Sequence, residues 1–419
     1  MMKKIFVLLL LTALILTPLS SAEFEWGGIF QNTTSGSSVG DWSLTQVDSI
    51  SLWADLSFVP LFNLKFSAGY RLKYSNETLS HIPEFGTFYA YGSNDRISYK
   101  AGRFTLKDMN NNLFSTTLDG AEFGWRNQKI ALKTGTGFTG LVFNDNSSVA
   151  MTSVDFQAIS DDALLASPRM AEYVEAAFYI LPGDGSLTAA FLAQQDLWAE
   201  NTLESEEGQL NSFFINLGLK GRLGNALFYN LYGTVQAGSY NMPVDDRSLD
   251  VRAGAMGLKV DIPLNLGLKP LISVDLFYSS GDKWSRTDHM GSLIEPVVSV
   301  LNQYTPFTMT SKGYVYSVGA GNQIYSDISL SISPFRGFSI VLESLTLFRA
   351  VDGPVSELPV SEEISDSSLY LGEEISLALN FKPLSDLGFQ IRGGAFIPND
   401  SVVAEGVQYK IGGFFSLSF

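Results

Sequence analysis

The last twelve residues of the chain, Gln408 to Phe419, alternate between apolar and polar side chains. A period of two places successive side chains on opposite faces of a β-strand. The large apolar residues share one face: Tyr409, Ile411, Phe415, Leu417 and Phe419. The other face carries Phe414 and otherwise small or polar residues: Gln408, Lys410, Gly412, Ser416 and Ser418. This pattern is typical of a membrane-spanning strand whose polar face lines a lumen, and it also fits the last strand of a soluble sandwich.

The N-terminus has the features of a secretory signal. Two lysines precede a short apolar run over residues 5–16, and small residues lead to Ala22. This arrangement predicts a signal peptide over residues 1–22, cleaved after Ala22, and one mature domain over residues 23–419. The apolar run is too short to cross a bilayer as a helix, which takes about 20 residues.

The composition favours a barrel over the soluble alternative. No later stretch approaches 18 consecutive apolar residues, although 45% of the chain is hydrophobic and 13% is aromatic. An exported chain without such stretches can cross a membrane only as a closed barrel, because every backbone amide in lipid must be paired. Charged residues make up 17%, whereas about 25% is usual in soluble domains. We therefore predict a transmembrane β-barrel in the bacterial outer membrane.

Turn signals divide the mature chain into strands of an up-and-down antiparallel barrel. Eight short connections alternate with nine long ones, which predicts eighteen strands with both termini on the periplasmic side. A missed or invented hairpin would give 16 or 20 strands. Three of the segments, near 186–199, 249–262 and 338–350, alternate poorly and are assigned as strands because the count requires them.

Other strands show clear polar and apolar faces. The best examples are residues 63–74, 268–278 and 370–382, where Lys269 and Asp275 share the polar face of the second segment. A charge facing lipid at the middle of the bilayer costs about 2–4 kcal/mol, so we assign the polar faces to the lumen.

With this assignment, inward bases gather near the two ends of the chain and are sparse on the middle strands. The predicted pore-lining bases are Lys65, Arg71, Lys73, Arg96, Lys100, Arg126, Lys129, Lys133, Arg392 and Lys410. The predicted inward acids are Asp55, Glu122, Glu175, Asp275, Asp327 and Glu374. The bases either pair with these acids and stiffen the wall, or they make the pore favour anions. The second interpretation predicts passive diffusion of small anionic solutes or oligosaccharides.

Two connections could narrow such a pore. Residues 106–117 lie where a constriction loop would fit, and the connection 281–320 is the longest in the chain. Connections of that length are usually functional or disordered.

A strand that ends on a terminal aromatic residue resembles the C-terminal assembly signal of bacterial outer-membrane barrels. The resemblance implies that the apolar face of residues 408–419 engages the barrel-assembly machinery, with outer-membrane lipid around the finished barrel. Three further regions resemble the alginate-export family of outer-membrane channels: Gly-Arg in 101–108 with Asp-Gly in 118–120, Ser-Gly-Asp at 280–282, and Tyr-Leu-Gly-Glu-Glu at 370–374, followed by 392–398. That resemblance implies an eighteen-stranded barrel with a basic, anion-conducting pore.

Other classes of function have little support. The chain has two histidines, His81 and His289, both in predicted outer loops, and no Gly-rich phosphate loop or spaced metal-ligand cluster. We therefore expect no enzyme activity, cofactor or metal. A net charge of −16 disfavours nucleic acid as a partner. The remaining alternative is a non-conducting barrel whose acidic surface loops bind a partner or a host ligand.

Overall fold

The computed structural model describes residues 23–38, 42–59, 61–75, 78–110, 113–144, 147–160, 163–181, 185–199, 207–224, 226–244, 246–283, 300–309, 311–355, 368–399, 402 and 406–419. The predicted signal over residues 1–22 and its cleavage point lie outside this part of the chain. His289 also lies outside it.

Eighteen long strands build the molecule. They are β1 (Glu23–Ser37), β2 (Ser43–Val59), β3 (Phe62–Ser75), β4 (Thr78–Ser93), β5 (Ile97–Lys107), β6 (Ser115–Arg126), β7 (Ile130–Phe138), β8 (Arg169–Leu181), β9 (Gly185–Asp196), β10 (Gln209–Leu223), β11 (Leu227–Met242), β12 (Arg247–Pro263), β13 (Leu271–Ser279), β17 (Gln323–Phe335), β18 (Phe338–Arg349), β19 (Tyr370–Leu384), β20 (Leu387–Pro398) and β21 (Gln408–Ser418).

Smaller elements complete the described structure. The two-residue strand β14 (Val300–Leu301) pairs in parallel with β12, and β15 (Ser311–Lys312) pairs with β16 (Val318–Gly319). The helix α2 (Ser153–Ser160) lies between β7 and β8. Within the described ranges, no helix is long and apolar enough to span a membrane.

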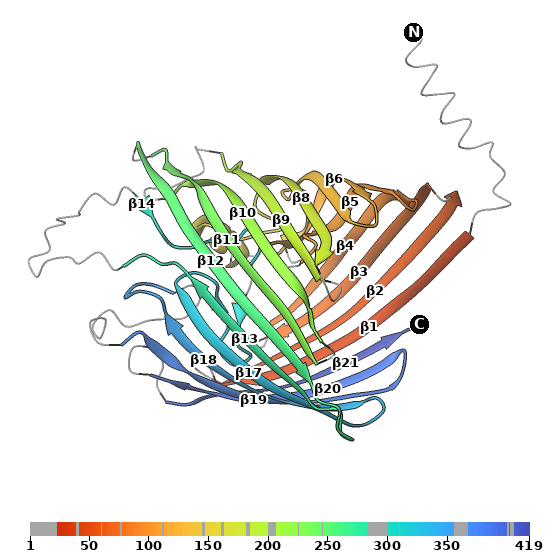
Figure 1. The fold of residues 1–419 in the computed structure, drawn as a ribbon, viewed down its shortest axis with the longest axis vertical. Coiled ribbons are helices and arrows are strands. Elements are labelled where there is room, and N and C mark those ends of the chain that lie inside the picture. The colour runs from red at the N-terminus through yellow and green to blue at the C-terminus, as the bar shows by residue number, and fades with distance from the viewer. Residues whose placement is uncertain are drawn as a thin grey trace, which may run out of the picture.

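The strands close into an antiparallel barrel (Figure 1). Each long strand pairs with the next one along the chain, and β1 pairs with β21 from Ile29–Ser418 to Ser37–Lys410. The prediction of an eighteen-stranded up-and-down barrel is therefore confirmed. The three poorly alternating segments are the strands β9, β12 and β18. In β9 and β12 the alternation is weak because small side chains such as Ala189, Ala190 and Ala255 stand on both faces without marking either. In β18 it is weak because the buried Leu345 and Leu347 make the lumen face apolar as well.

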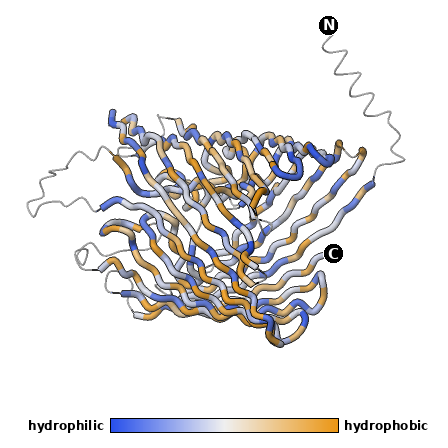
Figure 2. The backbone as a smooth tube through the Cα atoms, in the orientation of Figure 1, coloured by the Kyte–Doolittle hydropathy of each residue, from blue (hydrophilic) through white to orange (hydrophobic). Residues whose placement is uncertain are grey.

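Hydrophilic and hydrophobic residues alternate along the strands of the wall (Figure 2). On β19, Ile375 and Leu377 are 47% and 46% exposed on the outer face, whereas Glu374 and Ser376 are 2% and 3% exposed on the lumen face. Tyr409 is likewise exposed on the outer face of β21. Exposed apolar side chains on a barrel meet lipid, so burial and polarity agree with the predicted orientation.

One detail of the predicted strands is wrong. Lys269 does not face the lumen from a strand: it lies with a φ of 46° in the turn before β13, which begins only at Leu271. The strand β7 ends at Phe138. After Phe138 the chain continues as a narrow ribbon in which Phe143 bridges Leu165, and such a ribbon has the same period of two as a barrel strand.

The last residue supports the closing seam between β1 and β21. The Phe419 N–H donates to the Gly28 carbonyl at 3.0 Å, and the Gly28 N–H donates to the Phe419 carbonyl at 2.9 Å. A Cβ at Gly28 would stand 2.5 Å from the Phe419 ring, so a glycine is needed at this close approach.

Deleting Phe419 is expected to reduce the yield of inserted barrel severalfold. The deletion removes both hydrogen bonds and the terminal aromatic of the predicted assembly signal, Tyr409, Ile411, Phe415, Leu417 and Phe419. The heat-modifiable band of the folded barrel in isolated outer membranes measures the yield, with Phe419→Tyr as the aromatic control. An unchanged yield after deletion would contradict the assembly role.

Candidate functional site

The distal half of the β5–β6 hairpin leaves the wall and enters the lumen. The strand β5 pairs with β4 only up to Arg103, and β6 pairs with β7 only down to Asp119. Beyond these two residues β5 and β6 pair only with each other. The side chains of Phe104 and Leu118 are then 1% and 0% exposed, packed among lumen-facing side chains of the opposite strands. We call residues 104–118 the constriction hairpin. It contains the predicted constriction loop 106–117, whose position is confirmed.

The tip of the constriction hairpin is held by strands β8 to β10. The Met109 N–H donates to both carboxylate oxygens of Glu175 on β8, at 2.8 and 2.9 Å. The Asn110 amide reaches Thr188 on β9, and Lys220 on β10 approaches the Met109 carbonyl at 3.5 Å. The inward acid Glu175 therefore serves to position backbone in the lumen.

A second segment crosses the lumen from the longest connection. Residues 300–309 and 311–322 form this crossing segment. The Thr305 N–H donates to Gln236 of β11 at 2.9 Å, and Thr308 accepts a hydrogen bond from the Ser115 N–H of the constriction hairpin at 3.3 Å. Further along, Glu374 of β19 accepts the N–H groups of Tyr314, Val315 and Tyr316 at 2.7–3.2 Å. The described part of this connection is thus folded into the pore.

A third segment, residues 139–168 with α2, is fastened to the wall by a buried cation. The Arg169 guanidinium contacts Asp155 of α2 at 2.6 Å and Asp196 of β9 at 2.8 Å, and all three side chains are fully buried. Asp155 also accepts the N–H groups of Met151 and Thr152, which caps the start of the helix. Burial alone would raise the pKa of Asp155, but Arg169 and these hydrogen bonds lower the pKa by more, so it lies below its ordinary value.

The lowered pKa predicts an acid-sensitive attachment of α2. A carboxylate whose pKa falls on folding adds stability above its ordinary pKa of about 4, and this stability is lost as the pH falls through the folded pKa. We expect the midpoint temperature of heat modification to drop more between about pH 5 and about pH 3 in the wild type than in Asp155→Asn. Equal drops in the two proteins would contradict this role of Asp155.

The predicted basic sector is largely paired with acids. Lys100 and Lys133 flank Glu122 at 3.4 and 3.0 Å, and Lys65 lies 3.9 Å from Asp55. In the same way, Arg71 contacts Glu84 on β4, and Arg392 meets Glu343 at 2.9 Å. Lys410 lies 5.0 Å from the centre of the Tyr314 ring. The two interpretations of these bases are therefore compatible. Most of the bases pair with acids, and the wall keeps a positive excess because the bases outnumber their acidic partners on these strands.

Three of the predicted pore-lining bases lie at the rim instead of inside. Arg96 and Lys129 are exposed in short turns, and Arg126 ends β6 beside them. Together they border an open depression that also includes Asp95 and Trp125. The prediction continued the alternation of each strand into the following turn. A turn has no lumen face, so these residues lie at the rim.

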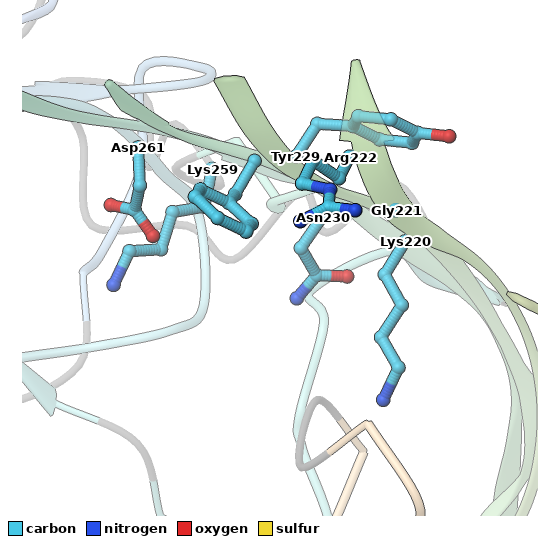
Figure 3. Close-up of a pocket in the computed structure, with 8 residues that line it drawn as sticks. Lys220, Gly221, Arg222, Tyr229, Asn230, Lys259 and Asp261 are labelled. Carbon is cyan, nitrogen blue, oxygen red and sulfur yellow. The ribbon is translucent and has the colours of Figure 1, made fainter. Parts of the chain in front are cut away.

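The middle strands carry inward bases that the sequence analysis missed. Figure 3 shows Lys220 and Asn230 on the same side of the sheet, with Tyr229 on the other. Lys259 and Asp261 of β12 line the same hollow of about 350 Å³. The alternation along β12 could have identified Lys259 and Asp261. Ala253, Ala255 and Gly257 mark the odd-numbered residues as the lumen face, and that face continues to Lys259.

Acids dominate the wall formed by β12 to β19. Asp275 and Asp327 both contact Lys312 of the crossing segment, at 3.0 and 2.7 Å. Burial would lower the pKa of Lys312, but the two carboxylates raise it above the ordinary lysine value. The lumen thus has a basic side and an acidic side. Among the described residues, no group of three or more histidines or acids could hold a metal ion.

The fold matches solved outer-membrane proteins of Pseudomonas aeruginosa. OccK2 (OpdF) in complex with glucuronate has a TM-score of 0.61 at 11% identity, covering 96% of this chain and 98% of that one. OccK5 (OpdH) gives 0.58 at 10% identity, covering 95% and 98%, and the outer membrane protein opdK gives 0.59 at 12% identity, covering 95% and 99%. No family model matches the sequence, and no curated protein matches it. The chain thus has the fold of these barrels over nearly its whole length.

These matches correct the resemblance to the alginate-export family, which is wrong. The motifs that suggested this resemblance have local structural roles that any large barrel can share. Arg103 and Asp119 pair at 2.8 Å where the constriction hairpin leaves the wall. Asp282 accepts the N–H groups of Asn302 and Gln303, and Glu374 holds the crossing segment.

Proposed function

We propose that the protein is a porin-like channel of the bacterial outer membrane for passive diffusion of small solutes. The observation that carries the proposal is a closed barrel whose lumen face is polar and is narrowed by segments tied to the wall. Outer-membrane lipid would surround the barrel, and the barrel-assembly machinery would insert it through β21. Barrels of this strand number are wide enough to hold an aqueous path.

The charge distribution supports a preference for small anionic solutes. On the wall formed by strands β2 to β7, five described lumen-facing bases stand against three lumen-facing acids, Asp55, Glu84 and Glu122, which leaves a formal excess of 5 − 3 = +2. The bases are Lys65, Arg71, Lys73, Lys100 and Lys133. Fixed charge on a pore wall attracts counter-ions and sets ion preference. OccK2, a barrel of the same fold, is described in complex with glucuronate, a small anion.

The inward folding of the loops speaks against the non-conducting alternative. The described parts of the constriction hairpin and the crossing segment donate hydrogen bonds to Glu175 and Glu374 on the lumen wall. Segments turned inward in this way shape a passage and leave less surface for an external partner.

Planar-bilayer recording of refolded protein under a salt gradient tests the proposal. Stable current steps with a reversal potential that favours chloride support the anion-preferring channel. Steps that favour potassium would retain the channel and reject the anion preference. An absence of steps from protein shown to be folded would reject the channel and favour surface binding.

A double charge reversal at Lys100 and Lys133 should invert the ion preference. Replacing both with Glu leaves three bases and five acids in the sector, so the formal excess changes from +2 to −2. We expect the chloride-to-potassium permeability ratio to fall by about threefold or more. The matched control is Arg96→Glu with Lys129→Glu, which makes the same charge change at the exposed turns. An equal shift in both variants would contradict a role for the lumen pair.

A further inference from the structure

The departure of the constriction hairpin leaves the barrel wall incomplete beside β4. Pairing between β4 and β5 covers six residue pairs, from Phe88–Arg103 to Ser93–Ser98. Gly102 marks the point of departure: its φ is 123°, and a Cβ there would lie 2.3 Å from the Phe88 carbonyl. Residues 78–85 of β4 pair with β3 on one side and have no pairing with β5 on the other.

The gap begins at the height of the hydrocarbon core. Six strand residues extend about 20 Å, which is about 15 Å of height at the usual tilt of about 40°, whereas the apolar band of such barrels is about 25 Å tall. An unpaired strand edge facing lipid would cost several kcal/mol for each backbone group. Pro83, which has no N–H to lose, stands in this free edge, where proline is tolerated in a sheet.

The ribbon that follows β7 covers the gap from the other side. In this ribbon, the Ala166 N–H donates to the Val142 carbonyl, and the Asn144 N–H donates to the Leu164 carbonyl. Arg103 fixes the ribbon by donating to the Leu141 carbonyl at 2.7 Å. On the outside, the Phe143 ring stacks on Phe85 of β4 with centroids 5.9 Å apart. Two aromatic rings therefore close a gap that backbone pairing leaves open.

Behind these rings lies a cavity of about 600 Å³ that reaches both faces of β4. Ser80 and Ile82 pair with Lys73 and Arg71, so they point to the lumen, whereas Pro83 pairs with the lipid-facing Tyr70. Of these six residues, Lys73, Ser80, Ile82 and Pro83 line the cavity. Lining residues from both faces of β4 place the cavity at the unpaired edge of this strand.

The lining combines polar and apolar side chains. Lys73, Ser75, Ser80, His81 and Asn144 contribute polar groups, and Ile82, Phe143, Ile159, Leu164 and Met309 contribute apolar surface. Leu164 is 69% exposed next to the opening. A lysine at the outer end of the gap, close to apolar walls, suits a molecule with an anionic head and an alkyl chain.

We propose that this window between β4 and the ribbon is a lateral binding site for a single-chain anionic amphiphile from the outer leaflet. The alkyl chain occupies the apolar part behind Phe85 and Phe143, and the head group meets Lys73. The site lies beside the aqueous path of the proposed channel, with Lys73 on its lumen side. Displacement of the Phe143 ring from Phe85 opens it toward lipid.

The chain contains no cysteine, which allows the window to be locked by one engineered pair. Radiolabelled dodecanoate is titrated onto protein in lipid nanodiscs, with empty nanodiscs subtracted. We expect saturable binding that weakens at least about tenfold in oxidised Phe85→Cys/Phe143→Cys, because the alkyl chain is excluded, and that returns after reduction. The matched control, Phe66→Cys/Phe88→Cys, joins another outer-face aromatic pair at a seam that is already hydrogen-bonded. Its oxidation should leave binding unchanged.

Two more variants keep the test decisive. Leu164→Trp fills the cavity from its exposed side and should weaken dodecanoate binding even if the engineered disulfide does not form. Lys73→Gln should weaken dodecanoate about tenfold and dodecanol little, because only the first carries a charge. The proposal is overturned if the wild type shows no saturable binding, if oxidation and Leu164→Trp both leave it unchanged, or if Lys73→Gln affects both probes equally. Single-channel conductance of the oxidised Phe85→Cys/Phe143→Cys protein should match the wild type, which separates the window from the pore.

Discussion

Shortening the constriction hairpin should raise the single-channel conductance about threefold, because this hairpin occupies cross-section that a barrel of this width otherwise leaves to water. Lys107 and Ser115 face each other as the last pair of β5 and β6. An Asn-Gly turn can therefore replace residues 108–114 without disturbing the strands. The variant loses the hydrogen bonds from the Met109 N–H to Glu175 and the contact of Asn110 with Thr188.

The control places the same Asn-Gly dipeptide in a turn outside the lumen. Gln128→Gly does so directly, because Asn127 precedes it in the turn between β6 and β7. Its conductance should equal that of the wild type. A shortened hairpin that conducts like the control would show that another segment limits the current, and the crossing segment would be the next candidate.

Replacing Arg169 with Leu should produce the largest loss of stability. The substitution leaves Asp155 and Asp196 fully buried without their cation, and removal of one partner from a buried ionic group typically costs about 3–5 kcal/mol. Gln194 and the Leu210 carbonyl also lose their hydrogen bonds with the guanidinium. The free energy of unfolding from urea titration in lipid nanodiscs measures the loss.

Two further proteins separate the buried network from arginine loss in general. Arg252 pairs with Asp250 at 3.0 Å on the surface, with both side chains mostly exposed, so Arg252→Leu should change stability little. The triple variant Arg169→Leu/Asp155→Asn/Asp196→Asn removes all three charges and should recover much of the loss. A triple variant as unstable as Arg169→Leu would assign the effect to packing.

Strand number and facing were accessible from the sequence because lipid and lumen impose opposite polarity on alternate residues. Ile375 and Leu377 face lipid, and Glu374 and Ser376 face the lumen, as their alternation predicts. The same rule failed where a turn ends the alternation, at Lys129 and Lys269, since periodicity carries no information about where a strand stops.

The candidate site was accessible only in part. The inward direction of Lys100, Glu122 and Lys133 follows from strand periodicity, but their mutual pairing depends on the register between β5, β6 and β7. The role of Glu175 in holding Met109, 66 positions earlier, leaves no mark in the local sequence. The resemblance to the alginate-export family failed for a related reason, because short motifs at strand ends recur wherever a barrel needs a turn or a capped loop.

By itself, the sequence determined the closed barrel of eighteen strands and the polarity of its two faces, because the cost of unpaired amides and charges in lipid permits few other solutions. Only the tertiary structure decided what fills that barrel. The constriction hairpin leaves the wall at Arg103 and Asp119, the buried Arg169 fastens α2, and Phe85 meets Phe143 across the resulting gap. These contacts join residues that lie far apart in the chain. Their energies depend on strand register, burial and distance, and these are defined only once the barrel has closed.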